Sequence, residues 1–367
     1  MQALYTCFNV IMLVGIEILC WLWPNLASPT LAFGVRIPPT RLGEPVIAQL
    51  RRRYRVALLL AGLIELLALL LVARLLPLEW QLWLMPLVVI AAVVIAGCLY
   101  ALMHRTLRRV KEREGWYSGL RQAIAVEVGL PERQARPSPV WLGLDLLLLG
   151  LLWGLTVVRY PALPERIPLH FGPNGQVDRW GGKEELLLFS LFALVINVLL
   201  LGLALTLPVR SRRLDPADPE QARLDRQRQQ QALRNLLAAV LGAVNLSFFL
   251  ILLLLTQVIP PTAFGIVFVG VLLLPLAILG LMIFYLAQAR PAHTYVVRTS
   301  YVERDDDRYW KAGIFYVNRD DPALFVERRM GVGWTVNMGQ PLGVGLVIGL
   351  LLAVVAILLV LLLLGQH

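Results

Sequence analysis

The side chains that could do chemistry are concentrated in one polar stretch of the sequence, residues 163–183. Its reactive side chains are Glu165, His170, Asp178 and Lys183. His170 and Asp178 are both common ligands of divalent transition metals, and a loop can bring them together. A closed zinc site needs four ligands, however, and this spacing supplies no familiar set. We therefore expect no bound metal and no cofactor, with a His170–Asp178 metal site as the less favoured alternative.

The backbone of this stretch is rich in proline and glycine, which predicts a series of turns and not a long regular element. If the stretch is only a brace, its polar side chains bond to the turn backbone, and Asp178 together with Gly175 holds a turn. If it is a recognition site, the same backbone presents Phe171 and Trp180 to a peptide or lipid, and His170 supplies directional hydrogen bonds. The predicted ligand-binding residues are His170, Phe171, Asp178, Trp180 and Lys183.

Three acidic residues fall inside apolar stretches: Glu17, Glu65 and Asp145. Burying an acid in a bilayer costs a few kcal/mol on insertion scales, so each of these residues is a functional candidate. The plainer interpretation is a hydrogen bond between helices or, for Glu17 and Asp145, contact with the lipid headgroups. Because the spans contain no matched bases, the three acids could instead mark an ion path, as in a proton-coupled transporter.

Sequence motifs of common enzyme classes are absent from the chain. There is no HExxH, no GxSxG and no Walker loop. We therefore expect that the protein is not an enzyme. A metal-dependent membrane enzyme that uses His170 and Asp178 is the remaining enzymatic alternative.

The elements that must position these residues are apolar. The chain has 367 residues, of which 58% are hydrophobic and 16% charged, whereas a soluble domain has roughly 25% charged residues. The hydrophobic residues form eight runs, each near the roughly 20 residues that a helix needs to cross a bilayer. The runs cover residues 3–23, 56–76, 82–103, 140–158, 185–208, 235–258, 263–288 and 342–364. This pattern predicts an all-α polytopic membrane protein with eight transmembrane helices.

Lysine and arginine are distributed unevenly between the connecting segments. Segments 24–55, 104–139, 209–234 and 289–341 carry 29 of the 34 basic residues. Because basic loops stay in the cytoplasm, both termini and the 163–183 stretch are expected outside, in the inner membrane of a bacterium. The same placement explains the net charge of +10 without nucleic acid, for which no binding motif is present.

The largest polar segment, 289–341, lies just before the last apolar run. Residues 294–297, 315–317 and 324–326 are β-prone, and turn-forming residues occupy 318–322. We expect a short cytoplasmic β-hairpin here. The predicted organisation is a three-span region at 1–139, a two-span unit with its outer loop (159–184) at 140–208, a linker helix with a two-span hairpin at 209–288, a cytoplasmic domain at 289–341 and the last span at 342–367.

Three stretches resemble a bacterial membrane family of unknown function. The first contains Leu163-Pro164, Ile167-Pro168, His170-Phe171, Gly175, Asp178 and Lys183. It is similar to the signature segment of that family, which includes the Sdp-type immunity proteins. The second, with Tyr309-Trp310-Lys311, Phe315-Tyr316, Asp320-Asp321-Pro322, Phe325-Val326 and Gly333-Trp334-Thr335, looks like an uncharacterised domain that often accompanies the first. Residues 33–55 also look like the larger relatives.

The resemblance implies a role in peptide immunity or signalling. Sdp-type proteins protect a cell from a secreted killing peptide and relay its presence to a cytoplasmic repressor. By this resemblance we expect a membrane sensor or immunity-type protein that recognises an extracytoplasmic ligand through residues 163–183. The expected partners are membrane lipid, an extracytoplasmic peptide and a cytoplasmic regulator, without nucleic acid.

Overall fold

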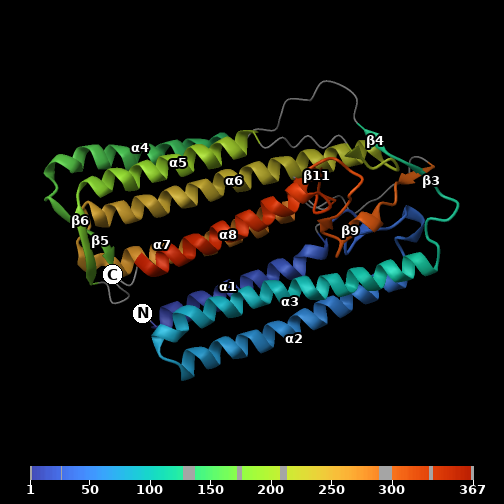
Figure 1. Cartoon of the computed structure of the whole chain (residues 1–367), viewed down its shortest axis with the longest axis horizontal. Helices are drawn as coiled ribbons and strands as arrows, with labels where there is room; N and C mark the ends of the chain where they lie inside the picture. The colour runs from blue at the N-terminus through green and yellow to red at the C-terminus, as the bar shows by residue number, and fades with distance from the viewer. Residues whose placement is uncertain are drawn as a thin grey trace.

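Long helices lie side by side along the longest axis of the molecule (Figure 1). The computed structural model describes residues 2–25, 27–126, 137–171, 176–206, 213–288, 300–329 and 334–364. The helices are α1 (Gln2–Leu22), α2 (Pro45–Leu75), α3 (Leu78–Arg113), α4 (Pro139–Arg159), α5 (Glu184–Thr206), α6 (Pro219–Leu255), α7 (Phe264–Gln288) and α8 (Pro341–Leu364). Four of them begin at a proline, whose fixed φ suits the first helical position.

Seven helices, α1 to α7, are long and apolar enough to cross a membrane. This confirms a mostly helical protein with several candidate membrane spans. Within the described residues, the qualifying apolar part of α8 is Pro341–Leu352, which is shorter than a span. The predicted eighth span therefore stays a prediction.

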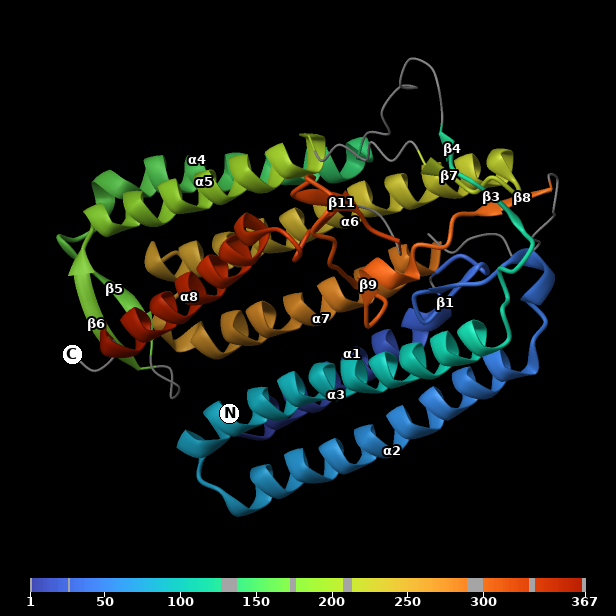
Figure 2. The same cartoon turned by 45° about the vertical axis from the view of Figure 1, so that its right-hand side comes forward.

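The helices form two groups (Figure 2). The first contains α1, α2 and α3, and the second contains α4, α5, α6 and α7, with α1 also packing against α7. Polar pairs join helices within the second group. Asn197 of α5 and Asn245 of α6 exchange two hydrogen bonds, at 2.5 and 2.9 Å, and Thr156 of α4 lies 2.8 Å from Ser190 of α5. Such bonds hold helices together where lipid would surround them.

Three of the helices are longer than a bilayer requires. α2, α3 and α6 have 31, 36 and 37 residues, which is roughly 47–56 Å at 1.5 Å per residue. A hydrocarbon core of about 30 Å leaves one end of each helix outside it. The protruding parts are the basic ones, at the start of α2, the end of α3 and the start of α6.

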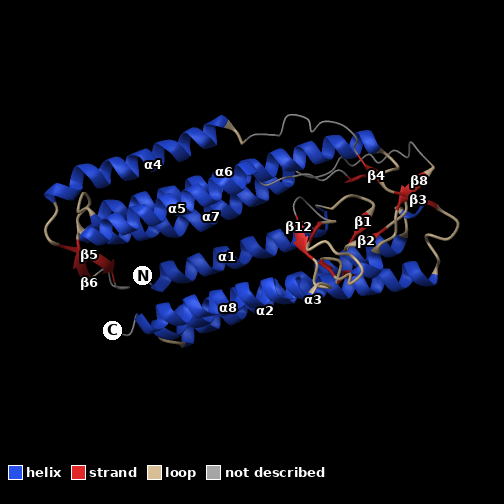
Figure 3. Ribbon diagram, turned by 45° about the horizontal axis from the view of Figure 1, so that its top comes forward, coloured by secondary structure: helices blue, strands red, loops and turns tan. Residues whose placement is uncertain are grey.

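Connections between helices gather at the two ends of the molecule (Figure 3). One end, called here the hairpin end, holds both chain termini and strands β5 (Arg166–Phe171) and β6 (Val177–Gly182). The other, called the polar end, holds the remaining short strands. The described parts of the four basic segments all lie at the polar end, so the predicted two-sided arrangement of the connections agrees with the fold.

The polar end is built from pairs of very short strands. They are β1 (Leu31–Ala32), β2 (Val35–Arg36), β3 (Arg121–Ala123), β4 (Ala125–Val126), β7 (Arg213–Leu214), β8 (Tyr301–Glu303), β9 (Trp310–Lys311), β10 (Phe315–Tyr316), β11 (Phe325–Glu327) and β12 (Trp334–Val336). β3 and β8 are parallel. The other pairs, β1–β2, β4–β7, β9–β10 and β11–β12, are antiparallel. Short 3-10 turns complete the described chain at Trp23–Asn25, Pro39–Arg41, Tyr160–Ala162, Pro261–Ala263 and Asp307–Tyr309.

The strand pairing in the last polar segment differs from the prediction. Strand-forming residues at 315–316 and 325–327 are present, but β10 and β11 do not pair across the turn at 318–322. β10 pairs back with β9, and β11 pairs forward with β12. The reason is Asn337, whose side chain binds the turn backbone and separates the two strands. Residues 294–297 lie outside the described residues.

Candidate functional site

The stretch expected to consist of turns is an antiparallel β-hairpin instead. β5 and β6 pair from Arg166↔Gly182 to Phe171↔Val177, with irregular register around Pro168 and His170. Proline cannot donate a ladder hydrogen bond, and it is tolerated here because each strand of a two-stranded sheet is an edge. The turn-based prediction was therefore wrong, because proline and glycine counts alone do not exclude an irregular hairpin.

One face of the hairpin is clamped to the helices. Ile167 is fully buried, and Leu169 and Phe171 pack against the same core. That core consists of Leu152, Leu163, Ile167, Leu186, Ala193, Leu252 and Leu255. The Phe171 ring also stacks on Phe264 at the start of α7, with centroids 5.3 Å apart. Phe171 is thus a packing residue on the inner face and not an outward anchor.

Lys183 closes the base of the hairpin. Its ammonium group donates to the Glu165 carboxylate at 2.9 Å, and its backbone N–H donates to the Glu165 carbonyl at 3.2 Å. The bond to Glu165 raises the pKa of Lys183. The ammonium also lies 5.7 Å from the centroid of the Tyr160 ring. These contacts make Lys183 part of the frame of the hairpin.

The outer face presents His170, Asp178 and Trp180. His170 Nδ1 lies 2.6 Å from Asp178 Oδ1, across the two strands. Their side chains are 65% and 48% exposed, and Trp180 is 55% exposed. Asp178 therefore holds the imidazole of His170, whereas the predicted turn with Gly175 lies outside the described residues. Exposed ion pairs contribute about 0–1 kcal/mol, so this pair adds little to stability.

The intramembrane acids form two separate sites. The Glu17 and Glu65 carboxyl groups are neighbours between α1 and α2. The carboxyl carbon of Glu17 lies 3.2 Å from the position that a Cβ on Gly62 would take. Asp145 lies in the other helix group, where its Oδ1 is 3.1 Å from the equivalent position on Gly242. Within the described residues, neither Asp145 oxygen has a hydrogen-bond partner.

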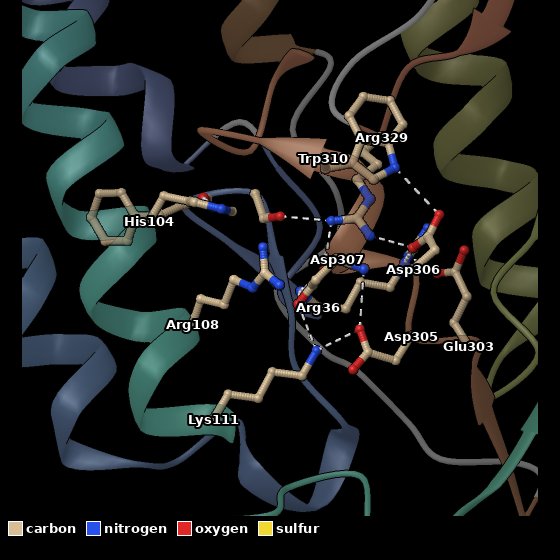
Figure 4. A network of polar contacts seen from close by, with 12 residues as sticks. Arg36, His104, Arg108, Lys111, Glu303, Asp305, Asp306, Asp307, Trp310 and Arg329 are labelled. Carbon is tan, nitrogen blue, oxygen red and sulfur yellow. Dashed lines mark hydrogen bonds and ion pairs between the residues drawn. The ribbon is translucent and has the colours of Figure 1, made fainter. Parts of the chain in front are cut away.

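At the polar end, a set of charged side chains that the sequence analysis did not single out forms a buried ion network (Figure 4). Its members are Arg36, Lys111, Glu303, Asp305, Asp306, Asp307 and Arg329. They come from β2, the end of α3, β8, the Asp307–Tyr309 turn and the residues after β11. The network thus joins three segments far apart in sequence.

Asp306 receives two guanidinium groups. Arg36 Nε donates to its Oδ1 at 3.0 Å, Arg329 pairs with the same oxygen, and Trp310 Nε1 lies 3.3 Å from Oδ2. The burial of Asp306 by itself disfavours ionisation. The charges of Arg36 and Arg329 outweigh this effect and hold the pKa of the carboxyl group well below its usual range.

Asp307 lies at the centre of the network. Its carboxylate accepts hydrogen bonds from Lys111 Nζ at 2.5 Å, from Arg329 Nη1 at 2.6 Å and from the Arg36 backbone N–H at 3.2 Å. Burial again opposes the charge, but Arg329 and Lys111 lower the pKa of Asp307 overall. Both aspartates are therefore ionised at neutral pH, and each is matched by neighbouring cations.

Two tight turns meet beside the network. Gly34, between β1 and β2, and Gly313, between β9 and β10, have φ of +69° and +77°. A Cβ on Gly34 would lie 2.5 Å from the Cα of Gly313. His104 of α3 closes the contact, with its Nδ1 2.8 Å from the Phe33 carbonyl oxygen. The N-terminal and C-terminal polar segments therefore meet backbone to backbone.

Two stretches of the chain match families of unknown function. The family described as "Domain of unknown function (DUF1648)" matches residues 147–194, which run from α4 through the hairpin into α5. The one described as "Family of unknown function (DUF5808)" matches residues 319–344, which include β11, β12 and the start of α8. The two matches fall at opposite ends of the molecule. They confirm that the first and second recognisable stretches belong to uncharacterised domains.

Comparison with whole proteins adds a partial relative. An uncharacterised protein of the archaeon Archaeoglobus fulgidus is 39% identical over 72 residues, which are 18% of this chain and 39% of the relative. The chain thus spans well under half the length of that curated relative. No solved structure matches.

Proposed function

We propose that this protein is a membrane sensor or immunity-type protein that recognises an extracytoplasmic ligand on the outer face of the β5–β6 hairpin. The observation that supports it is the two-sided construction of the hairpin. Ile167, Leu169 and Phe171 fix one face to the helices, while the exposed Trp180 and the His170–Asp178 pair remain on the other face. A rigidly held aromatic residue beside directional polar groups is typical of a binding hot spot.

A relay to the other side of the membrane would run through α7. Phe264 at its start stacks on Phe171 of the hairpin, and α7 ends at the polar end. There the chain continues, beyond undescribed residues, into β8, which contributes Glu303 to the buried ion network. A ligand that favours one position of the hairpin would thereby bias the surface of the polar end. This is where we place the contact with a cytoplasmic regulator.

The proposal assigns the hairpin end to the outside of a bacterial inner membrane, with α8 as an eighth span and both termini outside. In a variant without native cysteines, a cysteine placed at Gln176 should react with an impermeant thiol reagent in intact cells. A cysteine placed at Gln227 on α6 should react only after lysis, because basic segments stay in the cytoplasm. The reverse labelling pattern would invert the orientation.

The binding role is tested by expressing the chain in a peptide-sensitive bacterium and measuring tolerance to secreted killing peptides. His170→Ala and Trp180→Ala should each lower the tolerated concentration at least about tenfold, because hot-spot side chains carry 2 kcal/mol or more. Protein abundance should stay near wild type, since these exposed side chains contribute little stability. Trp80→Ala is the matched control: Trp80 is 59% exposed, near the start of α3 at the same end.

A transporter is the second candidate, favoured by the neighbouring carboxyl groups of Glu17 and Glu65. A hydrogen bond between two carboxyl groups requires one proton, which is a plausible element of a proton path. If Glu65→Gln abolishes tolerance while His170→Ala and Trp180→Ala do not, the recognition proposal is refuted. The functional centre would then lie between α1 and α2.

A further inference from the structure

A cavity at the end of α1 and the start of α2 has no role in the function proposed above. Its volume is about 570 Å³, within the range of about 300–1,000 Å³ that is usual for small-molecule sites. The lining side chains that matter here are Trp21, Asn25, Arg51, Arg52, Arg55 and Val56. Three arginines from two turns of one helix thus share a single cavity.

The cationic groups of the cavity are poorly neutralised by the protein. In the described part of the chain, the buried Nε of Arg51 has no hydrogen-bond partner. Arg55 is held in place by Asn25, at 3.3 Å from Nη2 to Oδ1, and by the Trp21 ring, 5.4 Å from the guanidinium carbon. The acid that lines the cavity, Glu44, is paired with Arg41 at 2.6 Å. The cavity therefore favours an anion.

The cavity lies at the depth of the lipid headgroups. Val56 begins the long apolar run of α2, directly after Arg55, and Trp21 ends the apolar run of α1. Tryptophan and arginine are both typical of the membrane–water interface, where the phosphate groups of phospholipids lie. The arginines therefore stand at the level of phosphate, and the Trp21 and Val56 side chains stand at the edge of the acyl-chain region.

We propose that this cavity binds the phosphate group of an anionic phospholipid. Arg51 and Arg52 donate to the phosphate oxygens, a contact for which the planar guanidinium group is well suited. Arg55, fixed by Asn25 and Trp21, adds charge without having to be ordered on binding. The Trp21 ring and Val56 contact the glycerol and the first acyl carbons. A soluble phosphate-bearing molecule would use the same chemistry, so the test separates the two sources.

The test uses the full-length protein purified in a neutral detergent. Binding is followed by native mass spectrometry during titration with phosphatidylglycerol, phosphatidylcholine or inorganic phosphate. Wild type should bind phosphatidylglycerol selectively. Arg51→Gln should weaken that binding about tenfold, as expected for loss of one hydrogen bond to a charged group. The matched control is Arg53→Gln, which makes the same charge change on the same helix but does not line the cavity.

Two outcomes would overturn the proposal. If Arg53→Gln weakens binding as much as Arg51→Gln, the lipid responds to general surface charge and the cavity is not a site. If inorganic phosphate binds as tightly as phosphatidylglycerol and displaces it, the ligand is a soluble phosphate and not a membrane lipid. Selective loss in Arg51→Gln, without loss in Arg53→Gln, supports a built lipid site.

Discussion

Replacing Arg329 by methionine should destabilise the protein by about 3–5 kcal/mol, because breaking a buried ion pair leaves an uncompensated charge. The Arg329 side chain is only 2% exposed. It pairs with Asp306 and Asp307 and donates to the Gly34 carbonyl at 2.8 Å. Methionine keeps much of the volume but none of the donors. The loss should appear as a lower thermal unfolding midpoint of the detergent-solubilised protein and as lower abundance in cells.

The neighbouring residue provides the control for this variant. Arg328 is exposed, so Arg328→Met removes the same charge without entering the buried ion network. It should change the unfolding free energy by less than about 0.5 kcal/mol. Equal unfolding midpoints for the two variants would mean that the network does not hold the polar end together.

The pH dependence of stability should change as well. Asp306 and Asp307 have folded-state pKa values below their ordinary ones. Their contribution to stability is therefore fully present above the unfolded value of about 3.9 and is lost as the pH falls through the folded values. Wild type should lose stability steeply below about pH 4. Arg329→Met should show a shallower decline, since part of this contribution is already absent.

Asn337→Ala should be nearly as damaging, with an expected loss of about 3 kcal/mol because several buried backbone groups would lose their partners. Asn337 is fully buried. Its Oδ1 accepts from the backbone N–H groups of Asn318 and Gly339, at 3.0 and 2.9 Å. Its Nδ2 donates to three backbone carbonyls of the turn, at 2.8, 3.0 and 3.1 Å. One side chain thus ties the turn at 318–323 to the residues that begin α8.

Limited proteolysis is a direct measurement for this variant. The turn contains Arg319, and trypsin should cut there faster in Asn337→Ala than in wild type, since the released turn becomes accessible. Thr335→Ala, two residues away in β12, should leave the cleavage rate unchanged. Unchanged cleavage in Asn337→Ala would show that the turn is held by something other than this side chain.

The membrane architecture was accessible from the sequence because its physical causes are local. Each candidate span announces itself by a run of apolar residues. The separation of hairpin end from polar end follows from the uneven distribution of arginine and lysine. Neither conclusion requires knowing which helix packs against which. The number of spans reached only seven in the described structure, and the outside orientation remains a proposal.

The candidate site on the hairpin was identified only by composition. The sequence selected His170, Asp178 and Trp180, but not the strand register that sets His170 against Asp178 or the packing that turns Phe171 inward. Register in an irregular two-stranded hairpin depends on which side chains the helices can bury. That choice was made by Leu152, Leu186 and Leu252, residues of three separate helices.

The buried ion network could be found only in the tertiary structure. Three consecutive aspartates, 305–307, look like a solvated charge run in the sequence, and Arg36 looks like one more basic loop residue. Their pairing spans about 270 residues of chain, and no local pattern records a contact at that separation. Folding brings α3 and the β1–β2 turn against the C-terminal segment, which removes water from these charges. Apolar runs and charge bias therefore determined where the chain lies, whereas long-range packing decided which charges meet.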